Sequence, residues 1–131
     1  MSRFADYGLI TNSEISARII SQDQRVNVVY EYVLQYFTSK ILLSDVAELA
    51  CMNPNAFCRY FKKRTNLTFV SFVNGVRISN ACRLLAETEM PVKRIGYESG
   101  FNNFSAFLNA FKKITELTPQ QYREIQLSKQ L

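Results

Sequence analysis

The sequence predicts an all-α protein built around a duplicated helix–turn–helix. Residues 61–68 read Phe-Lys-Lys-Arg-Thr-Asn-Leu-Thr, and residues 111–118 read Phe-Lys-Lys-Ile-Thr-Glu-Leu-Thr. Six of these eight positions match at a spacing of 50, and each copy ends a similar two-helix pattern. The turn between the two helices is one residue longer in the second copy. No segment alternates between apolar and polar residues for long, as a half-buried β-strand would.

The first predicted helix runs from about Asp23 to Thr38. Its apolar residues recur at intervals of three and four, which places them on one face of a helix. They are Val26, Val29, Tyr30, Val33, Leu34 and Phe37. Residues 1–22, by contrast, have weak periodicity and indicate a connecting segment.

Two short helices then form the first predicted helix–turn–helix, at about 43–64. Ser44 is expected to cap the first of them, with Asp45 in its first turn, where a carboxylate is favourable. Asn53 is expected to cap the second. Pro54 follows at its first helical position, where a missing amide hydrogen costs nothing.

A long helix, predicted at about 68–87 with Thr68 as its cap, joins the two units. Its apolar residues lie around much of its circumference, so we expect it to contact two neighbours. Gly75 costs roughly 1 kcal/mol relative to alanine in a helix interior, which suggests close packing there. Arg77 lies among apolar residues, and we expect it to form a structural ion pair.

The second helix–turn–helix is predicted at about 91–114. Pro91 is expected to start its first helix, and Gly100 to supply the left-handed residue that ends it. Asn103 is expected to cap the second helix. A last helix then opens at Thr118.

The distribution of charge singles out the repeated unit. The chain has a net charge of +5, but residues 55–113 hold ten basic and three acidic residues, a balance of +7. The remainder holds six basic and eight acidic residues, a balance of −2. A basic region that coincides with a duplicated helix–turn–helix is typical of a protein that binds DNA. The alternative is an ordinary solvated lysine surface.

Composition excludes several other classes of protein. The chain has no histidine, and Cys51, Cys58 and Cys82 form no Cys-x-x-Cys pair, which argues against a zinc finger and against histidine-dependent catalysis. We expect no metal, no cofactor and no enzyme activity. No apolar run reaches the ~18 residues of a membrane helix, and no secretory signal is visible. We expect a cytoplasmic protein whose cysteines are small buried apolar residues; a redox role for Cys58 stays open.

Each recognition helix should have an apolar face and an outward face. The predicted core residues are Phe57, Tyr60 and Phe61 in the first unit, and Phe107, Ala110 and Phe111 in the second. The outward residues, which are candidates for contacts with bases, are Asn55, Ala56, Cys58 and Arg59, and then Phe104, Ser105, Leu108 and Asn109. Alternatively, Phe104 and Leu108 pack against a neighbouring helix.

Phosphate contacts are expected from basic side chains outside the base-reading face and from helix N-termini. The candidates are Asn53, Lys62, Lys63, Lys93, Arg94, Asn103, Lys112 and Lys113. A linking helix of ~20 residues spans ~30 Å, close to the ~34 Å between successive major-groove segments on one side of B-DNA. One chain could therefore place both helices in adjacent turns without dimerising.

Two stretches near the C-terminus carry a family resemblance: Gly-Phe-Asn-Asn-Phe-Ser-Ala-Phe-Leu-Asn-Ala-Phe-Lys-Lys at 100–113, and Thr-Pro-Gln-Gln-Tyr-Arg at 118–123. They resemble the C-terminal signature of AraC/XylS-type transcription regulators. The first half fits as well, through Leu-Ser-Asp-Val-Ala at 43–47, Phe-Lys at 61–62, Arg-Ile at 77–78, Ala81 and Leu-Leu at 84–85. The resemblance covers roughly residues 24–126.

The resemblance implies a DNA-binding domain over 23–131 with seven helices, in which two homeodomain-like helix–turn–helix subdomains are joined by a long central helix. It implies binding to double-stranded promoter DNA, usually to activate transcription. The positions that contact bases in the family are here Asn55, Cys58 and Arg59, and then Phe104, Ser105, Ala106, Leu108 and Asn109.

Two positions depart from the family pattern. Gly96 stands where alanine is usual, which would loosen its helix. Asn109 stands where arginine is common, so the first unit would supply most of the specificity for guanine.

Family members often carry a sensor or dimerisation domain before this module, and residues 1–22 fit the end of such a connection. Alternatively, the chain is a complete short regulator of the kind that works as a monomer. An effector, where one exists, would bind that absent N-terminal domain, and RNA polymerase is a further partner that the resemblance allows. The alternative function is a helical protein-interaction module that does not read bases directly.

Overall fold

A computed structural model of the chain describes residues 24–130, so the predicted connecting segment lies outside the described residues. This range contains seven α-helices and no β-strand. The helices are α3 (Gln24–Tyr36), α4 (Leu43–Leu49), α5 (Pro54–Thr65), α6 (Phe69–Glu87), α7 (Val92–Glu98), α8 (Phe104–Thr115) and α9 (Pro119–Lys129). The predicted fold class is confirmed.

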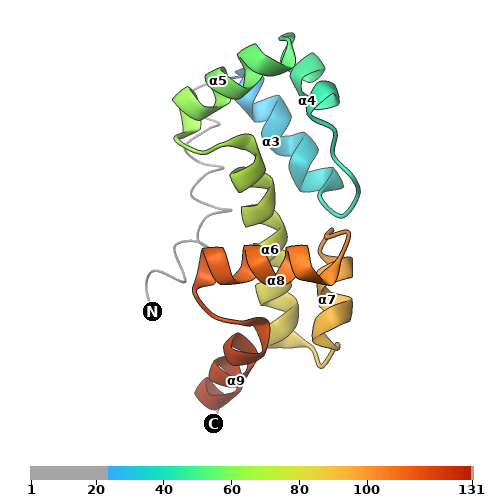
Figure 1. Cartoon of the computed structure of the whole chain (residues 1–131), viewed down its shortest axis with the longest axis vertical. Coiled ribbons are helices and arrows are strands. Elements are labelled where there is room, and N and C mark those ends of the chain that lie inside the picture. Colours follow the sequence, from blue (N-terminus) through green and yellow to red (C-terminus); the bar gives the residue numbers. More distant parts are fainter. Residues whose placement is uncertain (1–23, 131) are drawn as a thin grey trace.

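Helix α6 runs along the long axis of the molecule and carries one unit at each end (Figure 1). Helices α3 and α5 pack against its first half, with α4 packed against both of them, and α7, α8 and α9 pack around its second half. Each unit buries its own apolar core. On α6 the first core ends with Val76, and the second begins with Ile78. The helix therefore contacts more neighbours than the two that the sequence predicts, since α3, α5, α7, α8 and α9 all pack against it.

Local hydrogen bonds fix most helix ends where the sequence predicts them. The side chains of Asn53 and Asn103 each accept a hydrogen bond from a backbone amide three residues later, at 2.8 Å. Thr68 accepts one from the amide of Ser71 in the same way. Thr118 forms a capping box, which satisfies two otherwise unpaired amides at the start of α9.

Helices α4 and α7 begin differently from the prediction. The carbonyl of Leu42 already accepts the amide of Val46, so α4 begins at Leu43 and Ser44 lies inside its first turn. Ser44 is therefore not the cap. In the second unit α7 begins at Val92, one residue later than predicted, and Pro91 is the residue that precedes it.

The glycines of α6 and α7 also correct the sequence analysis. A Cβ added at Gly75 would meet no atom within 4 Å, so close packing does not require this glycine. A Cβ at Gly96 would lie 2.7 Å from Cδ2 of Phe107. Gly96 therefore does not loosen its helix, because the missing side chain makes room for a buried phenylalanine of α8.

The three cysteines lie in different settings. Cys82 is buried in the second core, as predicted, but Cys51 and Cys58 are exposed. Burial raises the pKa of the Cys82 thiol to about 12, although a side-chain hydrogen bond with Tyr122 lowers it in part. Among residues 24–130, no helix is long and apolar enough to cross a membrane.

Candidate nucleic-acid interface

The two units hold their second helices with the same set of hydrogen bonds. The Thr65 hydroxyl, at the end of α5, donates to the carbonyl of Phe61 at 2.8 Å and accepts the Leu67 amide at 3.1 Å. Fifty residues later, Thr115 makes the same two bonds at the same distances. The residue after each threonine has φ 66°, which turns the chain away from the helix end. The sequence repeat is therefore a repeat of structure.

The turns before these helices differ in length, as predicted. Residues 50–53 separate α4 from α5, and residues 99–103 separate α7 from α8, which gives four and five residues. Both turns end in an asparagine cap, so the first turn of each second helix is exposed to solvent with its amides partly satisfied. These two N-termini form the candidate interface.

Helix α5 presents a mostly polar outer face. Phe57 and Phe61 are buried in the first core, as predicted, and Tyr60 packs at its edge. Asn55, Cys58 and Arg59 are exposed, and Ala56 is partly buried. The predicted base-reading residues of the first unit therefore lie together on the side of α5 that faces away from the core.

Helix α8 presents a less polar outer face. Phe107, Ala110 and Phe111 are buried, as predicted. The exposed candidates are Ser105, Ala106 and Asn109. Leu108 is partly buried, and Phe104 is partly buried against the second core, with its ring centroid 6.3 Å from that of Phe107. Only part of the Phe104 side chain is thus available for other contacts.

The basic candidates fall into two groups. Lys62, Lys63, Lys112 and Lys113 are exposed at the ends of α5 and α8 and make no ion pair with any residue between 24 and 130. Lys93 is also exposed on α7, whereas Arg94 makes an ion pair with Glu98 at 3.7 Å. An exposed pair of this kind contributes little to stability, and its arginine can exchange partners.

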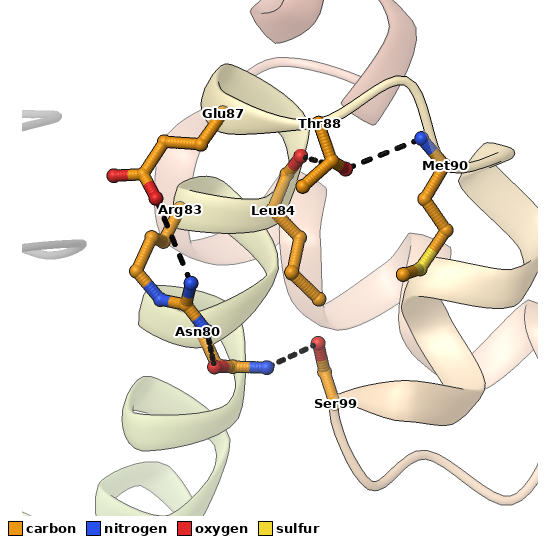
Figure 2. Close-up of polar contacts among 7 residues, drawn as sticks. All are labelled: Asn80, Arg83, Leu84, Glu87, Thr88, Met90 and Ser99. Atoms are coloured by element: carbon orange, nitrogen blue, oxygen red, sulfur yellow. Dashed lines mark hydrogen bonds and ion pairs between the residues drawn. The ribbon is translucent and has the colours of Figure 1, made fainter.

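Several side chains position the second unit through hydrogen bonds to distant parts of the chain. Figure 2 shows Asn80 of α6, whose amide donates to the hydroxyl of Ser99 at the end of α7, 3.2 Å away. Ser99 is fully buried, so this bond ties α7 to α6. Arg123 of α9 donates to the carbonyls of Leu85, Thr88 and Met90. The hydrogen-bond partners of Arg123 lie more than 30 residues earlier in the sequence, so the folded structure is needed to reveal these roles.

An open groove of about 590 Å³ lies beside α5, between that helix and the first half of α6. Cys58, Arg59 and Lys62 line one side, and Phe69 and Val73 line the other. Among the described residues, no group of histidine, cysteine, aspartate and glutamate side chains could hold a metal ion.

Comparison with known proteins identifies this arrangement. The family model described as a helix-turn-helix domain matches residues 46–125, which run from within α4 to within α9 and include α5, α6, α7 and α8. The chain belongs to the AraC-type helix-turn-helix family. This is a family of DNA-binding transcriptional regulators rather than of enzymes.

The relatives of this AraC-type chain are themselves described as regulators. It is 29% identical over 104 residues to the uncharacterized HTH-type transcriptional regulator YdeC of Bacillus subtilis, covering 79% of this chain and 36% of that protein. It is 31% identical over 108 residues to an uncharacterized HTH-type regulator of Staphylococcus aureus, covering 82% and 14%. The chain thus spans about a third or less of the length of these relatives.

Solved structures confirm the fold. The C-terminal domain of AraT, a response regulator from Geobacillus stearothermophilus, matches with a TM-score of 0.73 and 28% identity, covering 79% of this chain and 86% of that one. The DNA-binding domain of AdpA, a global transcriptional factor solved in complex with a target DNA, matches with a TM-score of 0.74 and 21% identity. That match covers 82% of this chain and 96% of the AdpA domain.

Proposed function

We propose that this AraC-type chain binds double-stranded promoter DNA by placing α5 and α8 in adjacent major-groove segments, and that it activates transcription. The observation that carries the proposal is the repeated frame, in which two capped helices are held by the same bonds and expose their N-terminal residues. Helix α6, with 19 residues, spans about 30 Å at 1.5 Å per residue. That length suits two helices one turn of B-DNA apart.

The first unit supplies the stronger base readout. Arg59 is exposed on α5 and pairs through its planar guanidinium with N7 and O6 of a guanine. Asn55 lies one turn earlier and suits an adenine. Ala56 and Cys58 are small side chains beside them, which suit contact with a thymine methyl group or the sugar.

The second unit reads a different kind of sequence. Asn109 occupies the position that corresponds to Arg59, fifty residues on. With Ser105 and Ala106 exposed beside it and Leu108 and Phe104 half-buried, this face favours adenine and thymine over guanine. The proposed site is therefore bipartite and asymmetric.

Contacts with phosphates position both helices. Lys62, Lys63, Lys112 and Lys113 are the cations free to make them, and Lys93 and Arg94 extend the basic surface along α7. The N-termini of α5 and α8, which follow Asn53 and Asn103, direct their main-chain amides at DNA phosphates. Each phosphate neutralised in this way releases counterions, so affinity should fall steeply as salt rises.

The proposed binding of promoter DNA also determines the compartment and the partners that we expect for this chain. The chain acts in the cytoplasm, needs no cofactor and binds no membrane. Activation proceeds through contact with RNA polymerase, and an effector, where one acts, binds a separate N-terminal domain. These statements depend on the family likeness and on the basic, twofold reading surface.

Selection from a random duplex library tests the proposal directly, with the affinity for the winning sequence measured at two salt concentrations. We expect a bipartite motif whose halves lie about one helical turn apart. A single short motif would mean that α8 contacts only the sugar–phosphate backbone of the DNA and reads no bases. No enrichment together with flat salt dependence would contradict DNA binding and favour a helical protein-interaction module.

A further inference from the structure

The two units share no apolar core among residues 24–130, so their relative orientation depends on the continuous helix α6 and on the contacts across the joint between them. Along α6 the two cores are separated at a single residue, Arg77, which lies between Val76 and Ile78. Arg77 is half-buried at this point and contacts both units. It is therefore placed where a change of angle between the units would have to occur.

Toward the first unit, Arg77 holds the turn that follows α3. Its Nε donates to the carbonyl of Phe37 at 2.8 Å, and one terminal nitrogen donates to the carbonyl of Ser39 at 3.0 Å. The predicted ion pair is not found among residues 24–130, where two backbone carbonyls are the hydrogen-bond partners of Arg77. Burial lowers the pKa of Arg77, yet an arginine stays charged at neutral pH, and two carbonyl dipoles face that charge.

Toward the second unit, Arg77 touches the turn between α7 and α8. Its guanidinium carbon lies 5.8 Å from the ring centroid of Phe101, which is buried in the second core. A Cβ at Gly100 would lie 2.8 Å from Nε of Arg77 and would collide with the carbonyl oxygen of Phe37. Figure 1 shows the turn after α3 directly above the turn between α7 and α8.

The bonding capacity of the arginine explains why it suits this place. A guanidinium offers several N–H donors in one rigid plane and stacks on an aromatic face. Here it satisfies two carbonyls of the first unit while covering an aromatic ring of the second. Lysine, whose ammonium group is a compact charge on a flexible stem and has no planar face to stack on a ring, could not hold both turns in one arrangement.

We infer that Arg77 sets the angle between the two units, and thereby the spacing between the two half-sites that the chain selects. The link to half-site spacing rests on the proposed function, because it requires α5 and α8 both to read bases. The link to the angle rests only on the contacts of Arg77 with Phe37, Ser39 and Phe101. The two links can be tested separately.

The matched variants are Arg77→Met and Arg83→Met. Both substitutions lie on α6 and remove one positive charge, but among residues 24–130 the polar partners of Arg83 are Asn80 and Glu87 of its own helix (Figure 2). Residual dipolar couplings of the free chain report the relative orientation of the units without DNA. We expect Arg77→Met to change that orientation or make it variable, and Arg83→Met to leave it unchanged.

The DNA measurement uses duplexes in which the distance between the selected half-sites varies by single base pairs. At the preferred spacing, Arg77→Met should lose about tenfold in affinity, the scale of one hydrogen bond to a charged group. Its spacing preference should broaden, while its affinity for either half-site alone stays the same. Arg77→Lys should behave like Arg77→Met, although it keeps the charge.

Two results would overturn the inference. One is an unchanged orientation of the units in Arg77→Met; the other is an unchanged spacing preference together with a uniform loss of affinity. If Arg77→Met does not fold, Phe101→Leu removes the ring under the guanidinium and keeps an apolar side chain, and the same criteria apply to it. If neither the wild type nor any variant selected a DNA sequence, the proposed function would be contradicted. The dipolar couplings would then still test whether Arg77 sets the angle between the units.

Discussion

Arg59 and Asn109 occupy corresponding positions in the two recognition helices, and they differ in what they can bind. A guanidinium donates two parallel hydrogen bonds to guanine, whereas a carboxamide donates one and accepts one, which suits adenine. The caps and hydrogen bonds that hold α5 and α8 are alike. We therefore expect the difference between these two side chains to determine which bases each unit prefers. Specificity in the proposed complex is thus a property of a few exposed residues.

Replacing Arg59 by alanine should cost on the order of 1–3 kcal/mol at the selected site and relax the preference at one base pair. Lys62→Ala is the matched control on the same helix, because it removes a charge that we assign to a phosphate. It should weaken all sequences about equally. Binding titrations against the selected site and its single-base variants distinguish the two; equal losses without any change of preference would contradict the assignment of Arg59.

The buried pair of Cys82 and Tyr122 should make the fold sensitive to alkali. Burial raises the pKa of Cys82 from an ordinary 9.0 to about 12 and also raises the pKa of Tyr122. Above pH 9 the unfolded chain therefore loses the Cys82 proton while the folded chain keeps it. The stability contribution is complete below pH 9 and is lost as the pH rises toward 12.

Urea unfolding measured between pH 8 and pH 12 checks this expectation. For one group the decline is at most about 1.4 kcal/mol per pH unit. The variant Cys82→Ala should show a shallower decline than the wild type, whatever its stability at pH 8. Cys58→Ala, which changes an exposed thiol, should keep the wild-type slope; a parallel slope for Cys82→Ala would count against the buried thiol as a source.

At the scale of elements, glycines in α6 and α7 give opposite predictions for the same substitution. Gly75→Ala should raise the free energy of unfolding by about 0.5–1 kcal/mol, because the new methyl group meets no neighbour within 4 Å and alanine favours the helix. Gly96→Ala should lower it by about 1–3 kcal/mol, because its methyl group would displace the buried ring of Phe107. Thermal or urea unfolding of both variants is sufficient, and a stabilised Gly96→Ala would contradict the packing.

Helix starts were the most predictable elements because their signals are local. Asn53, Thr68, Asn103 and Thr118 each bond an amide three residues away, so a short stretch of sequence contains both partners. Ser44 has the same chemistry but is the second residue of α4, because the carbonyl of Leu42 already accepts the first helical hydrogen bond. A capping residue therefore predicts a helix start only where the preceding backbone is extended.

The exposed face of each recognition helix followed from the spacing of its phenylalanines. Burial of Phe57 and Phe61, or of Phe107 and Phe111, leaves only one side of the helix outward. The spacing leaves the extent of exposure open, because Phe104 lies between the outward face and the second core, where its ring centroid is 6.3 Å from that of Phe107. The nucleic-acid contacts of these residues remain predictions.

At the scale of the whole molecule, the basic surface predicts a strong dependence of binding on salt. A plot of the logarithm of the association constant against that of the salt concentration should be linear with a negative slope. Lys112→Ala should reduce the magnitude of that slope by about 1. Lys129→Ala, at the far end of α9, should not; equal slopes for both variants would place Lys112 outside the interface.

The joint between the units could not be predicted from sequence. Arg77 bonds the carbonyls of Phe37 and Ser39, which lie 40 and 38 residues earlier and carry no side-chain signal. Backbone carbonyls are present at every residue, so only the folded geometry selects these two. An isolated arginine among apolar residues suggested an acid partner, and the structure uses main-chain oxygens instead.

The hydrogen bonds of Thr65 and Thr115, repeated at the ends of α5 and α8, affect which substitutions each helix can accept. The bonds and buried rings that hold each recognition helix are separate from the residues that face outward from it. A substitution at Asn55 or Arg59 therefore disturbs neither core, and leaves the other copy untouched. If both helices read bases as proposed, substitutions in one of them can change one half of the recognised sequence and leave the other half unchanged.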